Sequence, residues 1–241
     1  MALPRLNENV KYTMVIPSTG KEVEYRPYLV KEEKVMLIAL ESGDNKQMMM
    51  SVSDTIQSCL IDSDIVVRKL PMFDIEYMFL QIRSKAVGES TKLNLSCESE
   101  SCENVDEINV KFSSIKAPVV KHKKGSVIEL TDKISLQMKY PSYNELINIS
   151  VSEAKADVNT AFEMVISCVD FIIMDDEKIS LDDISKDEIN DFIDQFTVEQ
   201  FGKVQKYVTD MPTLTHDITW TCSLCEHKNS LTLKGTADFF Q

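Results

Sequence analysis

The fold of the β part of this chain is decided by two stretches of sequence, KLNLSCESESC at residues 92–102 and ITWTCSLC at residues 218–225. In each stretch apolar and polar residues alternate up to a cysteine pair, and this period of two predicts a strand with one wet face. The pairs have the spacings Cys97-x4-Cys102 and Cys222-x2-Cys225, and a second alternating run follows each pair. Each pair therefore falls at the tip of a hairpin. Two hairpin tips that each supply two thiolates are the layout of a zinc ribbon.

We predict a structural Zn²⁺ site made by Cys97, Cys102, Cys222 and Cys225. Short spacing within a pair lets one turn point both sulfurs at one ion, whereas the separation between pairs, here about 120 residues, is free. Reduced thiols without metal and disulfides are the alternatives, and a cytosolic location favours zinc over disulfides. His227 could replace a ligand, but four sulfurs complete the shell, so the zinc would be structural and not catalytic.

The period of two recurs elsewhere in the chain, in runs at residues 108–112, 127–130 and 134–138. Together with the run at 92–95, these predict four strands of an antiparallel sheet with one solvated face. Alternation returns after Pro212, at 218–221 and 230–234. The basic residues 121–125 are interpreted as a solvated hairpin turn, although they could also contact phosphate.

The first 90 residues predict a β-hairpin followed by helices. Alternation at residues 10–16 leads into the turn Pro17-Ser18-Thr19-Gly20 and a second short strand. Helices are expected at about 30–41, 44–59 and 71–85, with Asp44 as a cap and glycines as stops. The third helix has one apolar stripe at i, i+3, i+4 and i+7, made by Ile75, Met78, Phe79 and Ile82. We interpret all three helices as parts of the core.

Acidic residues concentrate in one later segment. Residues 145–210 hold 16 acidic and five basic side chains, a net charge of −11, out of −13 for all 241 residues. Helices are expected there at about 143–149, 153–173, 186–196 and 198–209, with capping boxes at Ser185 and Thr197. The acidic side is interpreted as a solvated helical face or, alternatively, as a docking surface for a basic partner.

The predicted class is therefore α+β, in three parts. Residues 1–90 form the N-terminal hairpin and helices, residues 91–141 and 213–241 form the antiparallel β region with the cysteine pairs, and residues 142–212 form an acidic helical insertion.

The charge and hydropathy also exclude several classes of partner. A pI of about 4.7 argues against binding duplex DNA or an anionic membrane, because both need a basic face. No apolar run approaches the roughly 20 residues that span a bilayer. The first eight residues lack the pattern of a signal peptide, so we expect a cytosolic protein.

Motifs of known enzyme classes are missing from the sequence. It has no phosphate-binding G-x-x-x-x-G-K-[ST] loop, no G-x-G-x-x-G turn, no H-E-x-x-H and no G-x-S-x-G. We therefore expect no enzyme. A zinc ribbon that binds nucleic acid is the alternative from another class, but it needs basic and aromatic residues beside the cysteines. This ribbon instead carries four glutamates there, Glu98, Glu100, Glu103 and Glu226.

Three stretches of the sequence resemble signatures of the T-even-type phage baseplate hub proteins. They are residues 25–34 (YRPYLVKEEK) with Leu37-Ile38-Ala39, residues 70–85 (LPMFDIEYMFLQIRSK) and residues 138–142 (MKYPS). The resemblance implies a myovirus tail protein used in building the hub at the centre of the baseplate. Some members of that family are described as hub subunits, and related ones as assembly factors that do not remain in the virion.

The resemblance also implies partners, a location and the lack of an active site. The expected partners are other baseplate hub or tape-measure proteins, which the chain would meet in the host cytoplasm during assembly and in the tail baseplate if it stays in the virion. A transient tail-assembly chaperone is the alternative. The family supplies no catalytic residues, and its members vary in their cysteine pairs, so the zinc prediction rests on this sequence alone.

Overall fold

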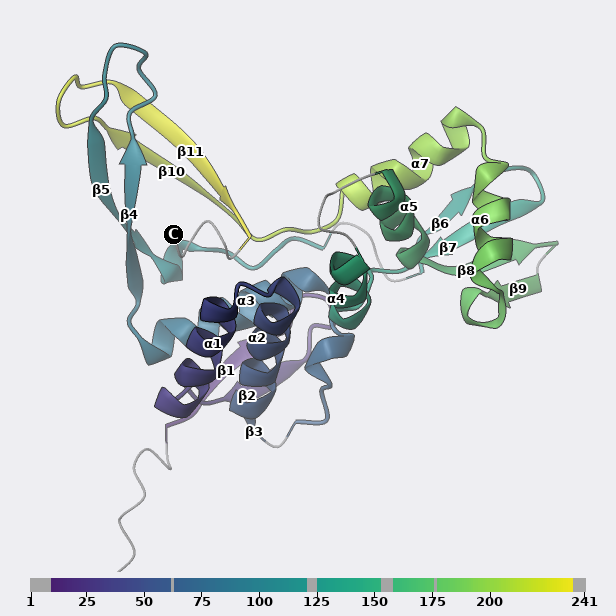
Figure 1. Ribbon diagram of the computed structural model, residues 1–241, viewed down its shortest axis with the longest axis horizontal. Coiled ribbons are helices and arrows are strands. Elements are labelled where there is room, and N and C mark those ends of the chain that lie inside the picture. Colours follow the sequence, from purple (N-terminus) through teal and green to yellow (C-terminus); the bar gives the residue numbers. More distant parts are fainter. Residues whose placement is uncertain (1–9, 62, 121–124, 153–157, 176, 236–241) are drawn as a thin grey trace, which may run out of the picture. The chain divides into compact units, whose positions relative to one another are not determined.

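The computed structural model describes residues 10–61, 63–120, 125–152, 158–175 and 177–235 (Figure 1). The chain divides into two compact units. Unit 1 comprises Met1–Val67, Phe73–Val119 and Thr213–Gln241, and unit 2 comprises Arg68–Met72 and Val120–Pro212. Each unit combines helices with antiparallel strands, which confirms the predicted α+β class.

Unit 1 begins with the predicted hairpin. Strands β1 (Tyr12–Val15) and β2 (Glu22–Tyr25) are antiparallel, and a short third strand, β3 (Leu60–Ile61), pairs with β2. The turn closes where the Gly20 amide donates to the Ile16 carbonyl at 2.8 Å. Gly20 has a φ of 68°, which glycine adopts without steric penalty.

Three helices of unit 1 lie close to their expected positions. They are α1 (Val30–Ser42), α2 (Asn45–Cys59) and α3 (Met72–Ala86). The Asp44 side chain accepts hydrogen bonds from the amides of Lys46 and Gln47, which confirms the predicted cap of α2. The predicted apolar stripe of α3 is buried as expected, at Ile75, Met78, Phe79 and Ile82.

The interpretation of α1 as a core helix is wrong. Only Glu32 and Ala39 of this helix are buried. Its large aliphatic side chains are more than half exposed: Val30, Val35, Leu37, Ile38 and Leu40. The sequence places apolar residues around the whole helix, but α1 packs against α2 and buries only Glu32 and Ala39.

Two further hairpins complete unit 1. Strand β4 (Ser90–Ser96) pairs with β5 (Val105–Lys111), and β10 (Thr215–Thr221) pairs with β11 (Lys228–Lys234). The two hairpins lie side by side although they are far apart in the sequence (Figure 1). They share an apolar cluster with Leu80 of α3 that contains Leu93, Val110, Phe112, Ile115, Leu214, Ile218 and Leu233. A short 3₁₀ turn, Phe112–Ser114, follows β5, and another, Val67–Lys69, precedes α3.

Unit 2 contains a four-stranded antiparallel sheet with helices. Its strands are β6 (Val127–Glu129), β7 (Ile134–Met138), β8 (Val169–Met174) and β9 (Glu177–Ser180), in that order across the sheet. Its helices are α4 (Tyr143–Ser152), α5 (Val158–Ser167), α6 (Lys186–Asp194) and α7 (Val198–Thr209), and a 3₁₀ turn, Leu181–Asp183, follows β9. The side chains of Ser185 and Thr197 cap α6 and α7 in capping boxes, as predicted.

Two predictions about these elements are wrong. The four alternating runs between residues 92 and 138 do not share one sheet, because β4 and β5 pair in unit 1 while β6 and β7 pair with β8 and β9 in unit 2. The helix expected at 153–173 ends at Ser167, and the residues after it form β8, where Ile172 pairs with Leu136 of β7. Residues 153–157 of that predicted helix, and residues 121–124 of the predicted basic turn, lie outside the described residues.

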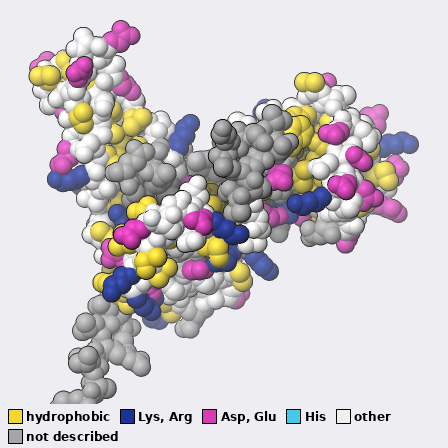
Figure 2. Space-filling view, viewed as in Figure 1, with side chains coloured by type: hydrophobic (Ala, Val, Ile, Leu, Met, Phe, Trp, Pro, Cys, Tyr) yellow, Lys and Arg dark blue, Asp and Glu magenta, His cyan; other side chains and the backbone are white. Residues whose placement is uncertain are grey.

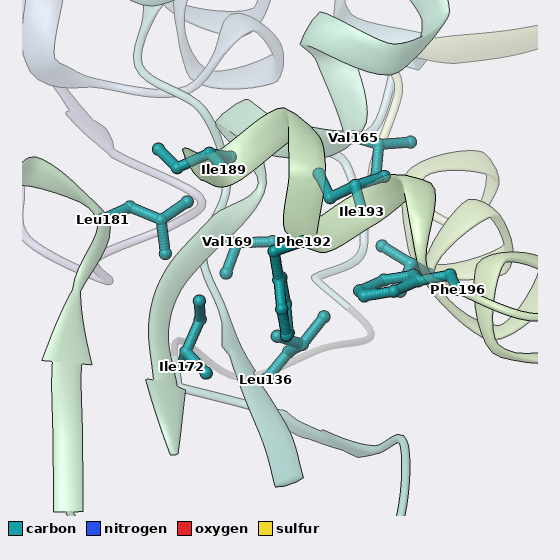
Figure 3. Close-up of a pocket in the computed structure, with 10 residues that line it drawn as sticks. Leu136, Val165, Val169, Ile172, Leu181, Ile189, Phe192, Ile193 and Phe196 are labelled. Atoms are coloured by element: carbon teal, nitrogen blue, oxygen red, sulfur yellow. The ribbon is translucent and has the colours of Figure 1, made fainter. Parts of the chain in front are cut away.

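The core of unit 2 is closely packed. Figure 3 shows the ring of Phe192, from α6, among the side chains of Leu136 on β7 and of Val169 and Ile172 on β8. The space left among these side chains is about 10 Å³. That volume is at the limit of holding one water molecule, so the packing among these residues leaves no ligand site there.

Candidate metal centre

The structure brings the four cysteines of the hairpin tips together. Cys97 follows β4, Cys102 precedes β5, Cys222 follows β10 and Cys225 precedes β11. Their four Sγ atoms all lie within 4.8 Å of one another. Residues 120 positions apart in the sequence therefore form one cluster inside unit 1.

The distances between sulfurs match a tetrahedral metal site. Sγ of Cys97 lies 3.6 Å from Sγ of Cys225, and Sγ of Cys102 lies 3.8 Å from Sγ of Cys222. A tetrahedron with Zn–S bonds of about 2.3 Å has sulfur–sulfur edges of about 3.8 Å. A disulfide would need about 2.05 Å, and all four thiols are free. The donor set and its spacing thus fit a zinc ion.

Backbone hydrogen bonds shape each tip. The Cys97 amide donates to the Asn104 carbonyl at 2.9 Å, and the Cys222 amide donates to the His227 carbonyl at 2.8 Å. Glu226, which follows the second pair, has a left-handed φ of 57°. These bonds continue each strand ladder past its last paired residue and turn both sulfurs of a pair toward the same point.

The electrostatics of the cluster favour a cation. Hydrogen bonding, foremost from the Cys225 amide, lowers the pKa of the Cys222 thiol to about 7, although burial opposes it. The Ser99 amide lowers the pKa of Cys97, but burial and the neighbouring thiols outweigh it and raise that pKa overall. Four thiolates this close repel one another, so their joint ionisation requires a positive ion among them.

A polar network beside the sulfurs escaped sequence reasoning. Nδ2 of Asn104 lies 3.5 Å from Sγ of Cys222 and 3.1 Å from Oγ of Ser223. The carboxylate of Asp106 accepts from Asn104 at 3.0 Å and from the Ser223 hydroxyl at 2.5 Å. The network joins the two hairpins directly. The sequence shows that each of these positions holds a polar residue. It does not show that the residues are in contact, because they lie far apart along the chain.

A second bridge between the tips is made by Asn229. Oδ1 of the buried Asn229 accepts from the Glu98 amide at 2.8 Å. Nδ2 of Asn229 donates to the His227 carbonyl at 3.1 Å. His227 thus contributes its carbonyl to the tip, and its ring is not part of the sulfur cluster.

The two remaining cysteines are buried at or next to the end of a helix. Cys59 ends α2 in unit 1, and Cys168 follows α5 in unit 2. Burial raises the pKa of Cys168 to about 12 and also raises that of Cys59. Both thiols are therefore protonated and inert at neutral pH.

The outside of the metal-centre tip is acidic. Glu98, Glu100, Glu103 and Glu226 are all exposed there. Figure 2 shows acidic side chains in magenta at the end of the paired hairpins. One large apolar side chain, Leu224, is 72% exposed between the two cysteines of its turn.

These observations define an α+β protein with a four-thiolate candidate site of structural type. None of the helices in the described residues is both long and apolar enough to cross a bilayer. The family described as T4 bacteriophage base plate protein matches residues 9–241, so the chain belongs to this family. This confirms the resemblance at the level of a phage baseplate protein and implies contacts with other baseplate components. No curated protein and no solved structure matched the chain.

Proposed function

We propose that this chain is a non-enzymatic component of the baseplate hub, or a factor that assembles the hub, and that a structural Zn²⁺ joins its two hairpin tips. Family membership over nearly the whole chain supports the baseplate assignment. The three stretches that resemble hub proteins support the more specific hub role.

The zinc ion would be held by Cys97, Cys102, Cys222 and Cys225. The observation that carries this proposal is the cluster of four sulfurs with cross-hairpin separations of 3.6 and 3.8 Å. Four protein ligands leave no open coordination position, and the ion would therefore fix structure without activating water. When bound, it supplies the positive charge that lets all four thiols ionise.

Metal content tests the zinc site directly. We expect about one zinc per purified chain, and replacement by Co²⁺ should give the intense thiolate-to-cobalt absorption of a four-sulfur site. Cys222→Ser should lose this absorption, whereas the matched control Cys59→Ala should keep it. A wild-type chain that is fully folded and free of metal would overturn the proposal.

The proposed partners are other hub or tape-measure proteins, met in the host cytoplasm during assembly. Residues 145–210 carry a net charge of −11, which suits a partner with a basic surface. Co-expression with each candidate partner, followed by purification through a tag on this chain, tests the association. We expect a stable complex whose affinity decreases as the salt concentration rises. The proposed hub role would be contradicted if no candidate partner co-purified.

Mass spectrometry of purified virions separates a hub subunit from a transient assembly chaperone. A subunit would be present at a constant ratio to the other baseplate proteins, whereas a chaperone would be absent. The acidic tip argues against the nucleic-acid alternative, because exposed glutamates repel phosphate. A filter-binding assay with single-stranded DNA at moderate salt should accordingly detect no complex.

A further inference from the structure

Helix α1 exposes several large aliphatic side chains to solvent. Val30 is 64% exposed, Leu37 is 51% exposed and Ile38 is 65% exposed. Three such side chains on one helix are unlike the isolated exposed residues that soluble proteins tolerate, and grouped apolar surface of this kind marks interaction sites. In Figure 2 yellow side chains lie over the region of α1, next to dark blue and magenta ones.

Three of the five exposed aliphatic side chains of α1 lie on one face of the helix, and the other two, Val35 and Leu40, lie to either side of that face. Val30, Lys34, Leu37, Ile38 and Glu41 follow the spacing i, i+4, i+7, i+8 and i+11, which places them on the same side. Lys34 and Glu41 flank the apolar centre, and both are exposed. Neither forms an ion pair in the part of the chain that the structure describes.

This face is complementary to itself. An antiparallel copy centred between Leu37 and Ile38 would place Leu37 against Ile38 of the partner subunit. The same pairing sets Lys34 beside Glu41 of the partner subunit, and two-fold symmetry repeats the pair on the other side. Opposite charges would thus flank an apolar centre twice, with no like charges of this set opposed.

We propose that α1 is the contact between two copies of this chain in an antiparallel, two-fold symmetric dimer. Charge complementarity points to a second copy as the occupant, because this arrangement gives both Lys34 and Glu41 a partner of opposite charge. The helix has 13 residues and is therefore about 20 Å long, so the contact is at the small end of specific interfaces. We expect the dimer to depend on protein concentration.

The test is the mass of the full chain in solution, measured by sedimentation over a range of concentrations. The monomer mass is 27.4 kDa, and we expect it to rise toward twice this value with concentration. Lys34→Glu and Glu41→Lys each replace two attractive pairs with two repulsive pairs, so each should raise the dissociation constant about tenfold. Ile38→Ser should also weaken the dimer. Circular dichroism checks that each variant is folded.

A mixture of two variants makes the test specific. Lys34→Glu and Glu41→Lys, when mixed, restore two attractive pairs in the heterodimer, and so does the double variant in its own dimer. The matched control Glu199→Lys reverses an exposed charge on α7 and should leave the mass unchanged. A wild-type chain that stays monomeric at all concentrations would overturn the proposal. The proposal would also be overturned if the α1 variants left the dissociation constant of the dimer unchanged, or if mixing the two single variants did not restore dimerisation.

Discussion

Asp74 is a buried carboxylate whose removal should stabilise unit 1 above pH 6. It lies in the first turn of α3 and is fully inaccessible to solvent. Its carboxylate accepts from the Ser18 amide at 2.9 Å and from the Ser18 hydroxyl, which ties the β1–β2 turn to α3. Burial raises the pKa of Asp74 to about 6, because the two hydrogen bonds from Ser18 only partly offset the loss of water.

The size and sign of the effect follow from this pKa. The unfolded chain has the ordinary value of about 3.9, and the difference corresponds to at most about 3 kcal/mol. Between pH 4 and pH 6 the folded state binds more protons than the unfolded state, so stability falls as pH rises. Above pH 6 the Asp74 carboxylate is ionised in the folded state, and the folded state is destabilised by the full amount. Asp74→Asn keeps an acceptor for Ser18 and stays neutral, so its gain in unfolding free energy should grow from near zero at pH 4 to about 2–3 kcal/mol at pH 8.

Urea unfolding at several pH values measures this difference. Trp220 is the single tryptophan of the chain and lies on β10 in unit 1, so its fluorescence reports the unit that contains Asp74. The control Asp54→Asn removes an exposed carboxylate from α2 in the same unit and accounts for the loss of one negative charge. A flat difference for Asp74→Asn would refute the reasoning. A variant less stable than wild type at pH 8 would mean that the N-terminus of α3 stabilises the charge more than burial destabilises it.

Three further predictions concern Glu32 and the metal centre. Despite burial, hydrogen bonds from Arg26 and from the Leu29 amide, both 2.8 Å, hold the pKa of Glu32 at about 2. Glu32→Gln should therefore lower the unfolding free energy by about 2 kcal/mol at pH 7, and urea curves should show this loss shrinking as pH falls from 4.5 through 2. Asn104→Ala should reduce metal affinity about tenfold in a chelator competition, because it removes the donor to Cys222. Removing the metal with a chelator should speed hydrogen exchange at the Cys97 amide and leave exchange in α5 unchanged, and equal effects at both places would contradict a local role.

The sequence predicted the cysteine cluster because short-range rules govern it. Alternation up to Cys97 and Cys222 predicts strands, and the close spacing within each pair predicts a turn that aligns two sulfurs. The caps at Asp44, Ser185 and Thr197 were predictable for the same reason, since a side chain there bonds amides two or three residues away.

The features that the sequence did not predict depend mainly on contacts between segments that lie far apart in the chain. The run at residues 165–173 is apolar enough for either a helix or a strand, and the register of Ile172 with Leu136 of β7 makes it a strand after Ser167. Strands β6 and β7 alternate as β4 and β5 do, and alternation alone does not say which strands pair. The exposure of α1 was unpredictable because apolar content indicates burial without saying whether the cover comes from the same chain.

Packing within the paired hairpins indicates what a bound metal would stabilise. Their shared apolar cluster includes Leu93 and Ile218, but it does not extend to the cysteine tip, where Val105 is 54% exposed and Leu224 is 72% exposed. Beyond the cluster, the tips are joined by the Asn104–Asp106–Ser223 network, by Asn229 and by the sulfurs. Hydrophobic burial therefore holds the base, whereas polar contacts hold the tip, together with the proposed metal when it is bound. Because the base has its own core, metal loss should open the tip locally and should not unfold the whole unit, in contrast to small zinc fingers that lack a core without their ion.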